Sequence, residues 1–170
     1  MVRFPKPLLA GDLIAVTAPS SGVSRPAIAR LEVVLSHVRS QGYRVIEGEC
    51  LRGHNKDASA PPTQRAHELM RFLTDPAVSA IIPPWGGELA IELLRPIDFE
   101  ALRSVSPKWL LGYSDLSAPC SYRSRSSPAG QLHPGTVGRL TVGRSHPPVV
   151  RRVAEDDLTE EGRHQIYARP

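Results

Sequence analysis

Residues 13–22 read LIAVTAPSSG, and this stretch decides the fold. Leu13–Ala18 is a short apolar run rich in residues that favour β-structure, which is typical of a buried strand. Pro19–Gly22 contains only proline, serine and glycine, which predicts a turn directly after the strand. The fold is therefore expected to begin with a core strand that opens into a loop of small residues.

A helix is expected after this loop. Between Ile28 and Val38 the apolar residues recur at steps of three and four, as they do on the buried face of a helix. Ser24 is placed to cap the helix, and Gly42 is placed to end it in the left-handed conformation. The first strand is thus followed by a helix.

The same alternation continues along the chain. Further strands are expected at Tyr43–Glu47, Ala77–Ile82 and Trp109–Gly112. Helical patterns lie between them, a long one that begins at Pro61-Pro62 and short ones at Glu88–Leu94 and Phe99–Val105. This order predicts an α/β fold, a mainly parallel sheet flanked by helices on both faces. Ligand sites in such sheets form in the loops after the strands, here Pro19–Gly22, Pro83–Gly87 and Tyr113–Asp115.

The composition changes near Ala118. Residues 1–118 carry 13 basic and 12 acidic side chains, a net charge of +1, and 54 of the 118 residues are apolar. Residues 119–170 carry eight arginines and five acids, a net charge of +3, and only 15 of the 52 residues are apolar. So few apolar residues cannot offset the entropy lost on ordering the segment. We therefore expect one folded domain over 1–118 and a largely irregular Arg/Ser/Pro-rich tail over 119–170.

Several protein classes are excluded by the sequence. A hydrophobic content of 41% excludes a wholly disordered chain. The apolar runs fall far short of the ~20 residues that a membrane span needs. The N-terminus lacks the apolar core of a signal peptide, so a cytoplasmic protein is expected. Cys50 and Cys120 have neither metal-ligand nor redox spacing and are expected to be free thiols.

Ser114 follows the last expected strand, in the sequence LGYSDL at 111–116. A serine on a tight strand-to-helix turn points outward, beside backbone N–H groups that can stabilise an oxyanion. The same serine can instead cap the helix, with Asp115 favourably placed near its amino end. Gly86 and Gly87 similarly allow either a close approach of backbone to substrate or an ordinary turn. Spacing alone leaves these alternatives open.

Four motifs in order carry a resemblance to a known family. They are LLAGD at 8–12, TAPSS at 17–21, DPAVSAII at 75–82 and GYSDLS at 112–117. Together they closely resemble the LD-carboxypeptidase family of serine peptidases, over about residues 5–117. The segment PWGGELA at 84–90 is similar to the microcin C immunity-protein branch more than to the branch of muramoyltetrapeptide carboxypeptidases that recycle murein.

The resemblance implies roles for several residues. Ser114 is the implied nucleophile, and the backbone N–H groups of Asp115 and Gly87 are the implied oxyanion hole. Trp85, Gly86 and Glu88 are then expected to contact substrate. Trp85 could stack on a nucleotide base, or could simply cover the end of the sheet.

The implied reaction is hydrolysis of an amide bond beside a free carboxylate. The substrate is either an L,D-peptide bond of a murein tetrapeptide or a peptidyl or aminoacyl nucleotide of the microcin type. No metal or cofactor motif occurs, so none of these groups is expected, nor is a nucleic-acid or membrane partner. The resemblance also leaves a homodimer open for the intact family members.

The family's other two catalytic residues, a glutamate and a histidine, belong to a C-terminal domain that the last 52 residues do not resemble. His133, His146 and His164 lie in Pro/Gly-rich or acidic surroundings, and none is expected to be the general base. Because a serine without a base is a weak nucleophile, a truncated and weakly active or inactive enzyme is expected. The alternative is a non-catalytic remnant or a module that binds a carboxylate peptide.

The tail has two interpretations. Read one base out of the present frame, residues 119–132 are compatible with an apolar helical stretch of the kind that follows Ser-Asp in the family. A frameshift would therefore explain the composition break and the absent domain together. The other interpretation is an evolved basic tail that binds nucleic acid or an acidic partner, although it has no aromatic interleaving beyond Tyr122.

Overall fold

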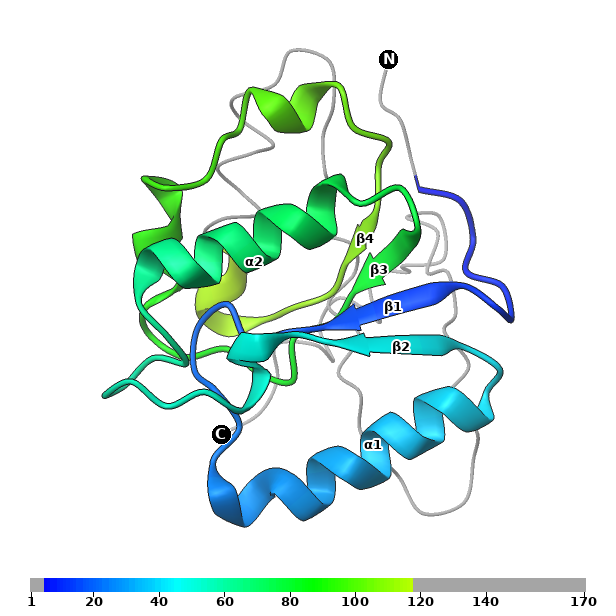
Figure 1. Cartoon of the computed structure of the whole chain (residues 1–170), viewed down its shortest axis with the longest axis horizontal. Coiled ribbons are helices and arrows are strands. Elements are labelled where there is room, and N and C mark those ends of the chain that lie inside the picture. The colour runs from blue at the N-terminus through cyan, green and yellow to red at the C-terminus, as the bar shows by residue number, and fades with distance from the viewer. Residues whose placement is uncertain (1–4, 118–170) are drawn as a thin grey trace, which may run out of the picture. The chain divides into compact units, whose positions relative to one another are not determined.

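The computed structural model describes residues 5–117, the part of the chain that holds all the elements named here. Four strands form one sheet: β1 (Leu13–Val16), β2 (Arg44–Glu47), β3 (Val78–Ile81) and β4 (Trp109–Leu110). All neighbouring pairs are parallel, and the order across the sheet is β2-β1-β3-β4 (Figure 1). The expected α/β fold with a parallel sheet is confirmed.

Two long helices connect these strands, α1 (Ile28–Ser40) and α2 (Pro62–Thr74). Gly42 has a φ of +85° after α1, which confirms the predicted left-handed end. The predicted cap is wrong in detail, because Ser24 precedes a 3-10 turn and its side chain makes no capping hydrogen bond.

The short helical patterns are 3-10 helices rather than α-helices. The five such turns are η1 (Arg25–Ala27), η2 (Glu49–Arg52), η3 (Ala90–Leu94), η4 (Ala101–Arg103) and η5 (Ser114–Leu116). Each spans five residues or fewer, the usual length for this tighter and less stable helix. Four of them, η1, η2, η3 and η5, come after the carboxyl ends of strands and so shape the connections at that edge.

The sheet has an apolar cluster on each face. Successive residues of β1 point to opposite sides, so Ala15 packs with α2 residues such as Phe72, while Ile14 and Val16 pack with Leu35 of α1. Figure 1 shows α1 and α2 on opposite sides of the sheet, as predicted. No helix within residues 5–117 is both long enough and apolar enough to cross a lipid bilayer.

The order of the strands determines where the loops after β1 and β3 lie. From β1 the chain crosses to β2 at one edge, whereas from β3 it crosses to β4 at the other. The loops after β1 and β3 therefore diverge between two adjacent strands, where open α/β sheets bind ligands. The predictions made for residues 119–170 lie outside the described residues.

Candidate active site

Ser114 occupies a strained turn directly after β4. Its φ is +62°, a left-handed conformation that costs a non-glycine residue about 1–3 kcal/mol and clusters at functional sites. The N-cap position of η5 belongs to Tyr113, so helix capping does not account for the serine. The side chain of Ser114 is exposed. Its conformation can persist only if the surrounding residues hold the turn in place.

The side chain of Asp115 provides that support. Its Oδ2 accepts a hydrogen bond from the Ser20 hydroxyl at 2.6 Å and another from the Ala90 N–H at 2.9 Å. Ser20 lies in the loop after β1, and Ala90 lies beyond β3. One carboxylate thus joins two of the loops predicted to form a site, Pro19–Gly22 and Tyr113–Asp115, to the start of η3, just beyond the third predicted loop, Pro83–Gly87.

Gly86 lies directly against the Ser114 turn. A Cβ at position 86 would lie 2.8 Å from the Ser114 Cβ and 2.8 Å from Asp115 Oδ1. Real Cβ atoms do not make such short contacts, so only glycine fits without a shift of the turn. Gly87 is equally restricted, because its Cβ would overlap the hydroxyl oxygens of Ser20 and Ser21. Both glycines thus pack closely against other parts of the chain, and the predicted approach of their backbone to substrate stays a prediction.

Trp85 and Glu88 differ in how they meet this site. The indole N–H of Trp85 donates to the Ser21 carbonyl at 3.0 Å, and the ring packs beside the apolar cluster on the α1 face of the sheet. Trp85 therefore links the loops after β1 and β3. Glu88 is exposed. The structure thus gathers Ser114, Asp115 and the two glycines closely, with Trp85 at their edge and Glu88 at the surface.

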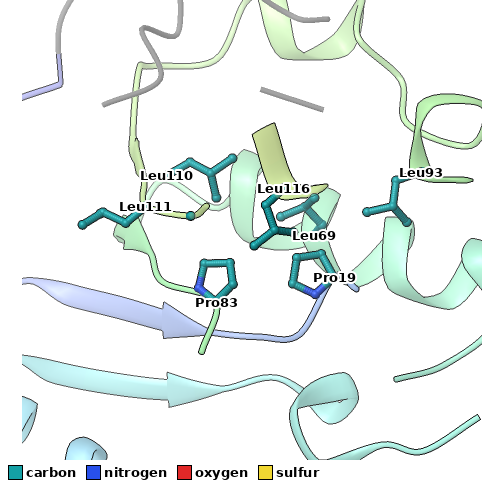
Figure 2. Close-up of a pocket in the computed structure, with 8 residues that line it drawn as sticks. Pro19, Leu69, Pro83, Leu93, Leu110, Leu111 and Leu116 are labelled. Carbon is teal, nitrogen blue, oxygen red and sulfur yellow. The ribbon is translucent and has the colours of Figure 1, made fainter. Parts of the chain in front are cut away.

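An apolar pocket opens beside the turn, between the ends of the strands and α2 (Figure 2). Leu116, two residues after Ser114, points into it. The pocket is lined by Pro19, Leu69, Pro83, Leu93, Leu110, Leu111, Gly112 and Leu116. Polar atoms hold the turn from one side, and this apolar wall borders it on the other.

Two side chains that shape the site were not singled out from the sequence, Ser20 and Arg65. Arg65 is fully buried in α2, and its guanidinium donates to Pro19 O at 2.8 Å and to Leu89 O at 3.0 Å. A signal for it existed, because Arg65 stands four residues before Leu69 on the apolar face of its helix. No signal in the sequence distinguishes Ser20 from Ser21. Within residues 5–117, no three His, Cys, Asp or Glu side chains gather to hold a metal ion.

Comparisons with known proteins show the family and the fold of this chain. Residues 14–127 match the model of the LD-carboxypeptidase N-terminal domain. A protein of Vibrio cholerae named as a carboxypeptidase is 36% identical over 115 residues, which cover 68% of this chain and 34% of that protein. The solved structure of MccF in complex with glutamyl sulfamoyl guanosine superposes with a TM-score of 0.66 at 23% identity, over 71% of this chain and 36% of that one.

One relative aligns over a longer stretch. A protein of Streptomyces coelicolor, also named as a carboxypeptidase, is 27% identical over 168 residues, which cover 97% of this chain and 48% of that protein. The alignment thus extends past residue 118, where the motifs of the sequence end. The chain spans about a third to a half of the length of the relatives that it matches.

Proposed function

Because the chain belongs to the LD-carboxypeptidase family, we propose that Ser114 is the nucleophile of a serine hydrolase that cleaves an amide bond beside a free carboxylate. The observation that carries the proposal is the left-handed Ser114 turn, held by Asp115 and packed against Gly86. Backbone strain of this kind is typical of positions where a side chain must be held in one orientation.

The proposed reaction follows from the arrangement of the turn. The Ser114 hydroxyl attacks the amide carbonyl carbon and loses its proton to a base, and the carbonyl oxygen becomes an oxyanion. The backbone N–H groups of Asp115 and Gly87 donate to that oxyanion. Collapse of the tetrahedral intermediate expels the amine, which takes up a proton, and leaves an acyl-serine that water then hydrolyses. Rigid support of both loops matters because the donors must be in place before the charge develops.

The base is not supplied by the residues around Ser114. No histidine has a contact with the turn within the described residues, and the family's catalytic glutamate and histidine have no counterpart among the motifs. We therefore propose that residues 1–170 by themselves are weakly active or inactive. The competing proposal is a non-catalytic module that binds carboxylate peptides, which needs no base beside Ser114.

For the substrate, we propose an aminoacyl or peptidyl nucleotide analogue of the microcin type rather than a murein tetrapeptide. Two observations support this choice, the sequence PWGGELA at 84–90 and the sulfamoyl nucleotide bound by MccF. Trp85 would offer a base an aromatic face at the edge of the site, and Glu88 would lie exposed beside it.

The first prediction tests this substrate class. We define the frame-restored protein as residues 1–117 followed by the gene's codons read one base out of the present frame. It is expected to hydrolyse glutamyl sulfamoyl guanosine faster than a murein L,D-tetrapeptide, as measured by mass spectrometry of the released products. Faster cleavage of the tetrapeptide would assign the murein substrate instead. Inertness toward both compounds would contradict the hydrolase proposal.

The second prediction concerns Gly86. Gly86→Ala in the frame-restored protein should lower kcat about a hundredfold, because a displacement of the nucleophile by about 1 Å can cost that much. The new Cβ forces Ser114 or the Tyr113 carbonyl, which would lie 3.0 Å away, to move. Gly11→Ala controls for backbone strain alone, because Gly11 has a φ of +91° and open space around it, and it precedes β1 at the far end of the sheet. Equal turnover of the two variants would show that Gly86 does not position the nucleophile.

A further inference from the structure

Arg65 is the largest side chain that the described residues bury completely. Its Nε donates to Ala60 O at 2.7 Å, and its Nη1 donates to Pro19 O at 2.8 Å and to Leu89 O at 3.0 Å. Its Nη2 pairs with the Glu92 carboxylate. Removing a guanidinium from water is expensive, and an apolar residue would pack on this helix face at lower cost. A role outside α2 is therefore indicated for this side chain.

The acceptors of Arg65 show where that role lies. Pro19 immediately precedes Ser20, whose hydroxyl donates to Asp115. Leu89 immediately precedes Ala90, whose N–H donates to the same carboxylate oxygen. Arg65 and Asp115 thus bridge the same two loops at adjacent residues, one through backbone carbonyls and the other through a hydroxyl and an N–H. Arg65 and Asp115 together hold both residues of the Pro19–Ser20 pair and both residues of the Leu89–Ala90 pair.

A further hydrogen bond joins these two loops directly. The Leu89 N–H also donates to the Ser20 hydroxyl oxygen at 3.3 Å, so the two loops contact each other between the two bridges. Gly87 lies in the same place, because a Cβ there would overlap that hydroxyl. Any shift of Pro19 or Leu89 would therefore move the Ser20 hydroxyl, and with it the carboxylate that holds the Ser114 turn.

We infer that Arg65 is a positioning residue of the active site, acting on Ser114 through the loops at Pro19 and Leu89 and then through Asp115. Its consequence for catalysis rests on the proposed function, whereas its effect on the loops does not. Arg65 donates no hydrogen bond to Asp115 itself, and the coupling between the two residues runs through the Pro19–Ser20 and Leu89–Ala90 backbone and the Ser20 hydroxyl.

The test measures amide hydrogen exchange by NMR on the 170-residue chain. The reporters are the Leu89 and Ala90 N–H groups, and the reference is the Arg44 N–H, which donates to Asp12 O at the other end of the sheet. In Arg65→Met the reporters should exchange at least tenfold faster relative to the reference. Arg65→Lys, which keeps a donor and the charge, should restore part of the protection and serves as the main variant if Arg65→Met does not fold.

Two controls separate positioning from simple loss of stability. Phe72→Leu weakens the core around the same helix without touching either loop, and Arg71→Met removes a half-exposed arginine from α2. Neither should change the ratio of reporter to reference exchange. If Phe72→Leu raises that ratio as much as Arg65→Met does, or if Arg65→Met leaves it unchanged, the inference is overturned.

The same variants separate this inference from the proposed function. In the frame-restored protein, Arg65→Lys should lower kcat and leave KM nearly unchanged, since the substrate itself does not contact Arg65. If Arg65→Met changes the amide exchange but the frame-restored protein without any substitution shows no turnover, the proposed function is contradicted and the positioning role is supported. Normal exchange in Arg65→Met would overturn the positioning role whatever the turnover.

Discussion

Ser114→Ala is expected to leave turnover of the 170-residue chain almost unchanged, and to lower turnover of the frame-restored protein at least about a thousandfold. The two proteins should differ because only the frame-restored protein is expected to supply a base for Ser114. A serine hydroxyl attacks efficiently only when a neighbouring group accepts its proton, and the residues that contact the Ser114 turn are a carboxylate, a hydroxyl and backbone amides. The Oδ2 of Asp115 already accepts hydrogen bonds from Ser20 and Ala90, and its buried Oδ1 has no hydrogen bond to Ser114 or to any other residue within 5–117, so neither oxygen is placed to take the serine proton.

Four proteins decide this prediction, the chain as given and the frame-restored protein, each with and without Ser114→Ala. The measurement is steady-state turnover of a substrate that the frame-restored protein accepts, with circular dichroism to confirm that each alanine variant folds. Robust turnover by the 170-residue chain that vanishes on Ser114→Ala would place the base within these residues. The proposal that these residues alone are weakly active or inactive would then be wrong.

The interpretation of the tail meets opposing observations. The fall in apolar content after Ala118 favours a shifted reading frame, whereas the Streptomyces coelicolor alignment, which covers 97% of the chain, favours a tail that is still related to the family. Sequencing of the gene separates the two, because a frameshift requires an open frame that continues one base away after Ser117. An uninterrupted frame that encodes the present tail would rule the frameshift out.

Hydrophobic periodicity predicted the sheet well because burial of each strand and helix is decided by local spacing. Leu13–Ala18 and Ala77–Ile82 both contain the strands found there. The form of the short helices was not predictable in the same way. A segment such as Glu88–Leu94 has too few residues for its own propensity to choose between a 3-10 turn and an α-helix, so contacts with neighbouring loops decide.

Parts of the candidate site could be predicted from the sequence only where the type of a residue limits what can lie around it. The family resemblance indicated Ser114 as the candidate nucleophile, whereas spacing alone left a purely structural role open for Ser114 and for the glycine pair. The left-handed φ of Ser114 and the bond from Ser20 to Asp115 depend on residues 95 positions apart in the chain. No local pattern carries that information, because the two residues meet only after the parallel sheet has aligned the ends of its strands.

The other large effect concerns Cys50, the buried cysteine within residues 5–117. Burial, together with the nearby Glu68 carboxylate, raises the pKa of its thiol to about 12 from an ordinary value of 9.0. Glu68 is held there by the Thr17 hydroxyl, the Glu49 N–H at 2.5 Å and the Cys50 N–H at 3.2 Å. The carboxylate thus satisfies the amino end of η2, and in doing so it disfavours a second negative charge on the thiol.

Alkylation of Cys50 by iodoacetamide at pH 7 should therefore be about a thousandfold slower in the native chain than in the urea-unfolded chain. The thiolate is the reacting form, and a rise in the thiol pKa from 9.0 to about 12 lowers the thiolate fraction by that factor. The measurement uses a Cys120→Ser background, so that Cys50 is the one thiol labelled, and follows the mass of the intact protein. The free energy of unfolding, measured on the same sample, subtracts labelling that passes through the unfolded chain. Glu68→Gln removes the negative charge but keeps an oxygen acceptor, and should speed native alkylation. Native alkylation within tenfold of the unfolded rate would instead mark Cys50 as a reactive thiol, and would make it a competitor of Ser114 for the role of nucleophile.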